Sequence, residues 1–236
     1  MNDPMARGGV RRYLDTVAPA EYYPDVGEVD LSEMTLTGLC DLYGSDKGNI
    51  KHRYTEVYER IIMGLIGRAG ASRKHCNLRI VEAGVACGAS LRALAQYLPA
   101  SQIFGYDIRP ECSTLCVDQE NVQIIIGDPA SLRVPDVGVD IFIDDASHIS
   151  ENILNMFENC WPWLNPGGYY VIEDLRCTYN DAYTQQFRDH FDPTVVNSRD
   201  TIMNMVDAVM RVVDERGDVS EFSYYPQMLV IQKTHL

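Results

Sequence analysis

Two apolar runs in this chain each end abruptly in a pair of adjacent carboxylates. Residues 141–145 read Ile-Phe-Ile-Asp-Asp, and residues 170–174 read Tyr-Val-Ile-Glu-Asp. Apolar runs of this length are typical of strands that are buried on both faces. In an open parallel sheet the ligand site lies beyond the carboxyl ends of the strands. We therefore expect the four acids to converge at one sheet edge, with His148 beside them and a hard divalent cation to neutralise them.

Short apolar segments alternate with helical patterns from residue 78 onward, which indicates βαβ units and a mostly parallel, doubly wound α/β sheet. Strands are expected over 78–82, 103–107, 122–127, 141–145 and 169–174, and an antiparallel C-terminal hairpin over 221–225 and 228–233, which makes seven strands. Helices are expected over 31–43, 53–69, 90–97, 110–120, 149–163 and 201–214. We divide the chain into an N-terminal arm with helices that closes over a cofactor, residues 1–70, and a catalytic domain, residues 71–236.

Composition narrows the class of partner. The 236 residues carry a net charge of −14, which argues against nucleic acid or an anionic membrane as a partner. The sequence shows neither the apolar core of a signal peptide nor a run of 18 apolar residues, so no membrane span is expected. Seven cysteines without a Cys-x-x-Cys pair suit reduced thiols in a cytoplasmic protein and offer no zinc site.

The first strand leads into a glycine turn that suits an adenosyl cofactor. Residues 82–90 follow the pattern Glu-x-Gly-x-x-x-Gly-x-Ser, which lacks the middle glycine of a dinucleotide fingerprint. A pyrophosphate needs that close backbone approach and a methionine tail does not, so S-adenosylmethionine (SAM) is favoured over NAD. Asp107, at the end of the second strand, is placed to accept from both ribose hydroxyls, and Asp128 follows the third strand, where adenine would lie. Asp144 is assigned a hydrogen bond to the cofactor or to the base.

Three segments resemble a known family. Residues 42–48 with 52–54, residues 142–148 and residues 166–174 are similar to the metal-dependent, SAM-dependent sugar O-methyltransferases that tailor antibiotics, among them the macrolide-sugar enzymes of mycinamicin and tylosin biosynthesis. The resemblance covers residues 36–233 and implies a class I SAM methyltransferase fold. The acceptor it implies is a glycoside or polyol whose vicinal diol is oriented by the metal.

The resemblance also assigns roles to individual residues. It implies Mg²⁺ ligands at Asp145, Glu173 and Asp174, a general base at His148, and cofactor contacts at the residues Ser45, Lys47, Glu82, Gly84, Asp107 and Asp128. The glycine-turn pattern adds Gly88 and Ser90 as expected cofactor contacts. One departure is Ala146, where the family commonly has glycine. The macrolide enzymes also carry a long N-terminal region that helps build their oligomer, so a homo-oligomer is expected here without a defined assembly.

Four other interpretations stay open at this point. The acceptor could be a catechol, a phenol or a polyketide; the enzyme could be an NAD-dependent oxidoreductase; or the domain could bind without catalysis. The first acidic pair could instead cap the helix that starts near Ile149. For the acceptor site, the aromatic residues Tyr22, Tyr23, Tyr179 and Tyr183 are candidates for stacking on a sugar or polyketide face.

Overall fold

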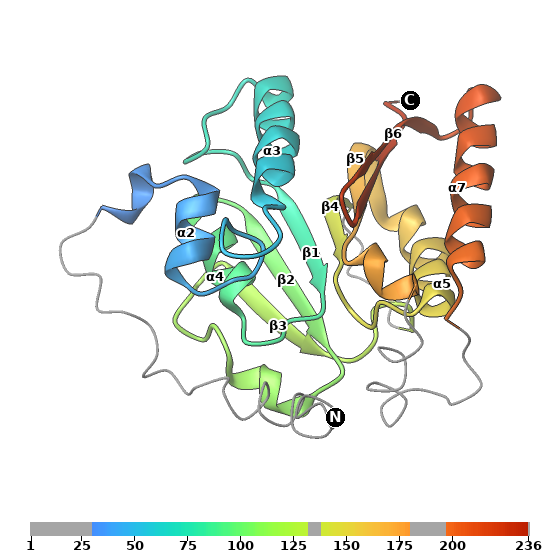
Figure 1. Cartoon of the computed structure of the whole chain (residues 1–236). Helices are drawn as coiled ribbons and strands as arrows, with labels where there is room; N and C mark the ends of the chain where they lie inside the picture. Colours follow the sequence, from blue (N-terminus) through green and yellow to red (C-terminus); the bar gives the residue numbers. More distant parts are fainter. Residues whose placement is uncertain (1–29, 132–137, 180–196, 236) are drawn as a thin grey trace, which may run out of the picture.

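The computed structural model describes residues 30–131, 138–179 and 197–235 and contains one seven-stranded sheet (Figure 1). Its strand order is β3-β2-β1-β4-β5-β7-β6. The strands are β1 (Arg79–Ala83), β2 (Gln102–Asp107), β3 (Val122–Ile126), β4 (Val139–Asp144), β5 (Leu164–Ile172), β6 (Val219–Tyr225) and β7 (Met228–Lys233). The first five are parallel, and the β6–β7 hairpin joins β5 antiparallel. The predicted doubly wound sheet with an antiparallel C-terminal hairpin is confirmed.

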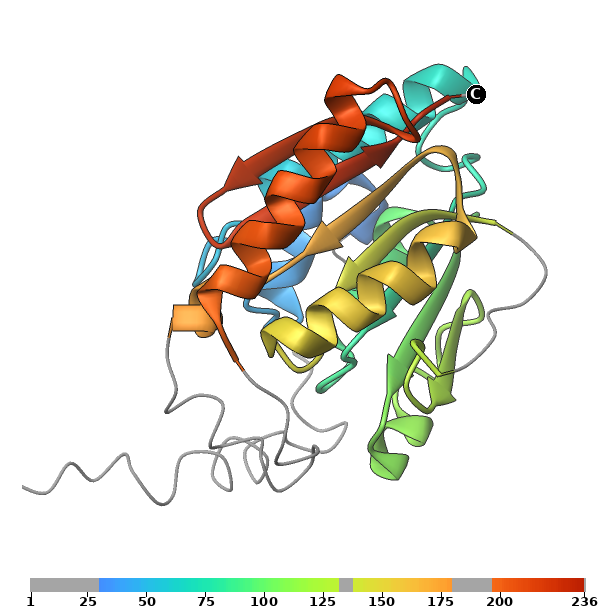
Figure 2. The same ribbon diagram turned by 90° about the vertical axis from the view of Figure 1, so that its right-hand side faces the viewer.

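Helices cover both faces of the sheet (Figures 1 and 2). One face carries α2 (Leu36–Leu42), α3 (Thr55–Ala69) and α4 (Ala89–Tyr97), and the other carries α5 (Ser150–Cys160) and α7 (Arg199–Asp214). Short 3₁₀ helices are η2 (Leu31–Glu33), η3 (Pro110–Thr114), η4 (Trp161–Trp163) and η5 (Leu175–Tyr179). Within the described residues, no helix is long and apolar enough to cross a membrane.

Each face of the sheet has its own core because side chains alternate along a strand. On β4, Ile141 and Ile143 pack with α2, α3 and α4, whereas Phe142 packs with α5 and α7. The tyrosine ring of Tyr170 on β5 stacks on Phe142, with the ring centroids 4.9 Å apart. The same alternation decides which face Asp144, Asp145 and Glu173 take at the strand ends.

Two local predictions were wrong. The helix expected over 110–120 is only the 3₁₀ turn η3, because this stretch is rich in Ser, Thr, Cys, Val and Asp, which have low helix propensity. Residues 165–168, expected to end the preceding helix, belong to β5, whose register with β4 shifts there. A Cβ on Gly168 would lie 3.0 Å from the carbonyl oxygen of Asp140, so this bulge needs glycine to bring the two strands together.

Candidate functional site

Two of the four predicted acids leave the sheet on the same face. Asp145 follows Ile143 by two positions and Glu173 follows Val171 by two, so both side chains lie on the α2–α3 side of the sheet. The backbone keeps the two ends in register, since the N–H of Asp145 donates to the carbonyl of Ala83 at 3.0 Å and that of Glu173 to the carbonyl of Asp144 at 3.0 Å. Strand periodicity therefore brings the two acidic ends together.

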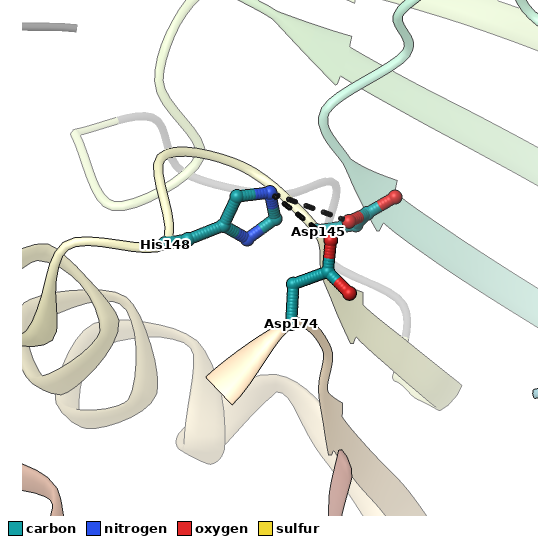
Figure 3. A group of neighbouring side chains, drawn as sticks. All are labelled: Asp145, His148 and Asp174. Atoms are coloured by element: carbon teal, nitrogen blue, oxygen red, sulfur yellow. Dashed lines mark ion pairs between the residues drawn. The ribbon is translucent and has the colours of Figure 1, made fainter. Parts of the chain in front are cut away.

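His148 faces two carboxylates at this edge (Figure 3). Its Nε2 lies 3.8 Å from Oδ1 of Asp145 and 3.9 Å from Oδ2 of Asp174. One ligand atom from each of Asp145, His148 and Asp174 lies within 4.8 Å of the other two, so the three residues could hold a metal ion. Both His148 and Asp174 have a left-handed backbone, with φ values of 55° and 52°, which costs of order 1–3 kcal/mol each and is concentrated at functional sites.

A buried ammonium lies among the carboxylates. Lys47, in the loop between α2 and α3, is only 4% exposed, and its Nζ lies 2.7 Å from Glu173, 3.5 Å from Glu82 and in ion-pair contact with Asp145. Burial alone would lower the pKa of Lys47, but the three carboxylates raise it well above its usual value. Lys47 is therefore a fixed positive charge that joins the end of β1 to the ends of β4 and β5.

Helix α3 and its N-cap residue supply two phenol donors to the acids. The Tyr58 hydroxyl donates to Oε1 of Glu173, while Lys47 holds the other oxygen of that carboxylate. The Tyr54 hydroxyl donates to Oδ1 of Asp174 at 2.6 Å. Both tyrosines fall on the apolar stripe of the helix, so periodicity predicted them only as core residues. Their polar ends could have been noticed because a buried tyrosine hydroxyl needs a partner.

His52 extends this polar layer. Its ring stacks on Tyr54 with the centroids 4.9 Å apart. Its Nε2 lies 3.6 Å from Asp46 and 3.8 Å from Asp174, and it makes no hydrogen bond to any residue that the structure describes. The His52 imidazole thus faces Oδ1 of Asp174, whereas His148 faces Oδ2 of the same carboxylate.

The glycine turn lies directly against the acidic site. Gly84 has φ +97°, and a Cβ on it would lie 2.1 Å from the carbonyl oxygen of Asp145. Only glycine therefore lets the turn after β1 approach the loop after β4 so closely. Gly88 caps α4 with φ +78°, and its Cβ would meet the sulfur of Cys116 at 2.8 Å.

Glu82 presents one satisfied and one unsatisfied oxygen at this turn. Its Oε1 accepts from the Ser90 hydroxyl at 2.7 Å. Its Oε2 is buried and has no hydrogen-bond partner among residues 30–131, 138–179 and 197–235. A buried carboxylate oxygen needs a donor, and a cofactor ammonium group would supply one. Ser45, also buried in this region, accepts from the backbone N–H of Lys47 at 3.4 Å.

The remaining predicted cofactor acids end β2, β3 and β4. Asp107 is buried at the end of β2, and Asp128 is exposed beyond β3, where its Oδ1 accepts from the N–H of Ala130 at 2.9 Å. Asp144 does not join the Lys47 and His148 cluster, because alternation turns it to the α5 face, where the Tyr170 hydroxyl lies 3.5 Å away. Burial raises the pKa of Asp144 to about 7. The expectation that all four acids converge was therefore wrong for Asp144.

Helix capping does not account for the first acidic pair. The N-cap of α5 is Ile149, without a side-chain cap, and the Ser147 hydroxyl accepts from its N–H at 3.3 Å. Asp145 instead points to Lys47 and His148. Neither carboxylate of this pair therefore caps α5.

Residues 81–175 match the family model of a methyltransferase domain. In this segment the chain is similar to methyltransferases. Its relatives include the 8-demethyl-8-α-L-rhamnosyl tetracenomycin-C 2′-O-methyltransferase of Streptomyces olivaceus, with 37% identity over 65% of this chain and 41% of the relative. They also include the mycinamicin VI 2″-O-methyltransferase of Micromonospora griseorubida, with 29% identity over 76% of this chain and 44% of the relative. The chain thus spans less than half the length of these relatives.

The fold of this chain resembles that of a solved protein. The methyltransferase MycE of the mycinamycin biosynthetic pathway, crystallised with Mg and SAH, superposes with a TM-score of 0.66 at 22% identity, over 85% of this chain and 55% of that one. This similarity shows a class I SAM methyltransferase fold. The homologues of the chain are sugar O-methyltransferases of antibiotic pathways, as the resemblance implied.

Proposed function

We propose that this chain is a SAM-dependent, Mg²⁺-dependent O-methyltransferase that acts on a sugar hydroxyl of an antibiotic-type glycoside. The observation that carries the proposal is the contact between the glycine turn after β1 and the acid–histidine cluster after β4 and β5, bridged by Lys47. A cofactor at the turn and an acceptor at the cluster would then be neighbours. The names of the relatives support SAM as the methyl donor and a sugar as the acceptor.

The residues present fit a divalent cation. Three carboxylates, those of Glu82, Asp145 and Glu173, contact the single ammonium of Lys47, and the Asp174 carboxylate lies beside Asp145, so the acids outnumber the ammonium. Asp145 and Asp174 would hold the ion from the His148 side. The third predicted ligand, Glu173, already has both oxygens engaged, and it would coordinate by exchanging either Lys47 or the Tyr58 hydroxyl for the ion.

The cofactor site is built from the same edge. The unsatisfied oxygen of Glu82 suits the amino group of a methionine tail. Gly84 and Gly88 let the turn that would bind this tail pack closely against Asp145 and Cys116. Asp107 would take the ribose, and Asp128, beyond β3, the adenine amine. When bound, SAM supplies a sulfonium methyl group and the divalent ion lowers the pKa of a coordinated hydroxyl.

His148 would accept the proton of the acceptor hydroxyl. Its Nε2 lies between the two aspartates that would also bind the ion, so a hydroxyl held there meets the base directly. The left-handed backbone of His148 aims the imidazole back at the cluster from the loop before α5. A role as base requires that His148 does not itself coordinate the metal, and an Asn variant separates these two roles.

Calorimetry with S-adenosylhomocysteine (SAH) tests the cofactor and the metal together. Wild type should bind SAH, and Mg²⁺ binding should be lost in Asp145→Asn while SAH binding persists. If wild type binds NADH and not SAH, the methyltransferase proposal is wrong and the oxidoreductase alternative stands.

Turnover with a panel of acceptors tests the substrate and the base. Rhamnosides and other diol glycosides should be methylated in preference to catechols, phenols and unglycosylated polyketides. His148→Asn should lose about 10²–10⁴-fold in kcat while still binding Mg²⁺. His75→Asn is the matched control, because this exposed histidine pairs with Ser72 far from the site. Preferred methylation of catechols would overturn the sugar assignment alone.

A further inference from the structure

The carboxylate of Asp107 is saturated with hydrogen bonds inside this chain. Its Oδ1 accepts from the backbone N–H of Arg109 at 2.9 Å and from Nε of Arg109 at 3.0 Å. Its Oδ2 accepts from the N–H of Val85 at 3.0 Å, the N–H of Ala86 at 3.3 Å and Nη2 of Arg109 at 2.9 Å. A carboxylate offers about four lone-pair positions. Five donors leave no position for two further hydroxyls.

Only two of these five donors can leave. The three backbone N–H groups are fixed by the turn after β1 and the start of η3. The guanidinium of Arg109 reaches both carboxylate oxygens through two parallel N–H groups, which is the same arrangement that the two hydroxyls of a ribose diol would offer. Its side chain is 27% exposed, and its Nη2 also donates to the carbonyl of Ala86 at 3.2 Å. The group therefore has open space into which to move.

We propose that the guanidinium of Arg109 occupies the ribose-diol position of the cofactor site and is displaced when the cofactor binds. The inference rests on the proposed cofactor. Arg109 holds the carboxylate of Asp107 ionised and oriented before binding, and the diol then takes over its two hydrogen bonds. Arg109 is thus a positioning residue that lowers the net affinity for the cofactor, because each binding event must break a bidentate ion pair.

The charge state of the pair agrees with this role. Burial would raise the pKa of Asp107, but the hydrogen bonds and charge of Arg109 and the N–H of Val85 hold it below its usual value. A carboxylate that stays ionised is a ready acceptor for two hydroxyls as soon as the guanidinium leaves. Removal of the Arg109 side chain leaves three backbone donors on Asp107, so the turn keeps its local support.

The test is calorimetric titration of the full chain with SAH. Arg109→Ala should bind SAH about tenfold more tightly than wild type, since no ion pair has to be broken. Arg109→Lys should fall between the two, because one ammonium cannot bridge both oxygens. Arg211→Ala is the matched control: it also breaks an Arg–Asp pair, with Asp207 at 2.8 Å, but on the exposed face of α7, and its SAH affinity should equal that of wild type.

A modified ligand shows whether the effect acts through the ribose. The gain in Arg109→Ala should shrink for the 2′-deoxy analogue of SAH, which has lost one of the two hydroxyls. SAH binding to wild type with equal or weaker binding to Arg109→Ala and Arg109→Lys would overturn the inference alone. Absence of SAH binding to wild type and all variants would overturn the proposed cofactor, and the inference with it. Circular dichroism of each variant confirms that it is folded.

Discussion

Replacement of Lys47 by methionine removes the single ammonium that the three carboxylates of Glu82, Asp145 and Glu173 share. The methionine side chain has a similar length and volume, so the change is mainly one of charge. Lys47 and two of these acids are almost fully buried: the side chains of Lys47, Glu82 and Glu173 are 5%, 1% and 2% exposed. Breaking a buried pair of this kind costs about 3–5 kcal/mol, because an uncompensated charge stays behind.

A loss of this size is easily measured. At about 2–4 °C per kcal/mol for a chain of this length, Tm should fall by roughly 6–20 °C, and urea unfolding should show a lower midpoint with an unchanged slope. Added Mg²⁺ should raise the free energy of unfolding of Lys47→Met by more than that of wild type, since the ion then supplies the missing positive charge.

The nearby Lys51 provides a matched control. It pairs with Asp46 at 3.1 Å but is 54% exposed, so Lys51→Met should change stability by about 1 kcal/mol at most. If Lys47→Met were as stable as Lys51→Met, the carboxylates would not depend on Lys47, and the description of Lys47 as their counter-ion would be wrong.

Three further outcomes are expected. Gly84→Ala should cost at least about 2 kcal/mol in urea unfolding, because its Cβ would meet a carbonyl at 2.1 Å with φ +97°, whereas Gly64→Ala in open space on α3 should gain about 0.5–1 kcal/mol; equal effects would refute the close-approach argument. Tyr58→Phe should cost about 1–3 kcal/mol by leaving Oε1 of Glu173 without its donor, and an unchanged unfolding midpoint would show that this hydrogen bond contributes nothing. Because the folded pKa of Asp107 is lowered, its contribution to stability is present above pH ~4 and is lost as pH falls through the folded value. Thermal scans of Asp107→Asn and wild type should therefore differ at pH 7 and converge at the acid end, and a difference that persists there would contradict this sign.

Much of the site could be predicted from the sequence because strand periodicity is a strict rule. Apolar runs that end in acids predicted the sheet edge at which Asp145 and Glu173 meet, and the spacing of the glycines predicted the turn after the first strand. The same rule, applied one residue earlier, places Asp144 on the opposite face, a consequence that the sequence analysis did not take into account.

What the sequence could not provide were long-range pairings of polar side chains. Nothing local indicates that Lys47 contacts acids 98 and 126 residues away, or that the tyrosines of α3 donate to acids beyond β5. The 3₁₀ turn at Pro110–Thr114 was missed because weak helix propensity decides such a short stretch, and the bulge in β5 was missed because its glycines have the composition of a loop. The roles of the individual site residues stay predictions.

The span of the Lys47 contacts has a further consequence for how the site is lost. Every acid that this lysine neutralises lies in a strand of the sheet or directly after one. The lysine itself comes with α2 and α3, which can separate from the sheet only by opening their shared apolar core. A local opening of that segment would expose the carboxylates and remove their counter-charge in one step. The acidic site is then intact only while residues 36–69 are packed on the sheet. Hydrogen exchange in α2 and α3 therefore measures the fraction of molecules in which the site is formed.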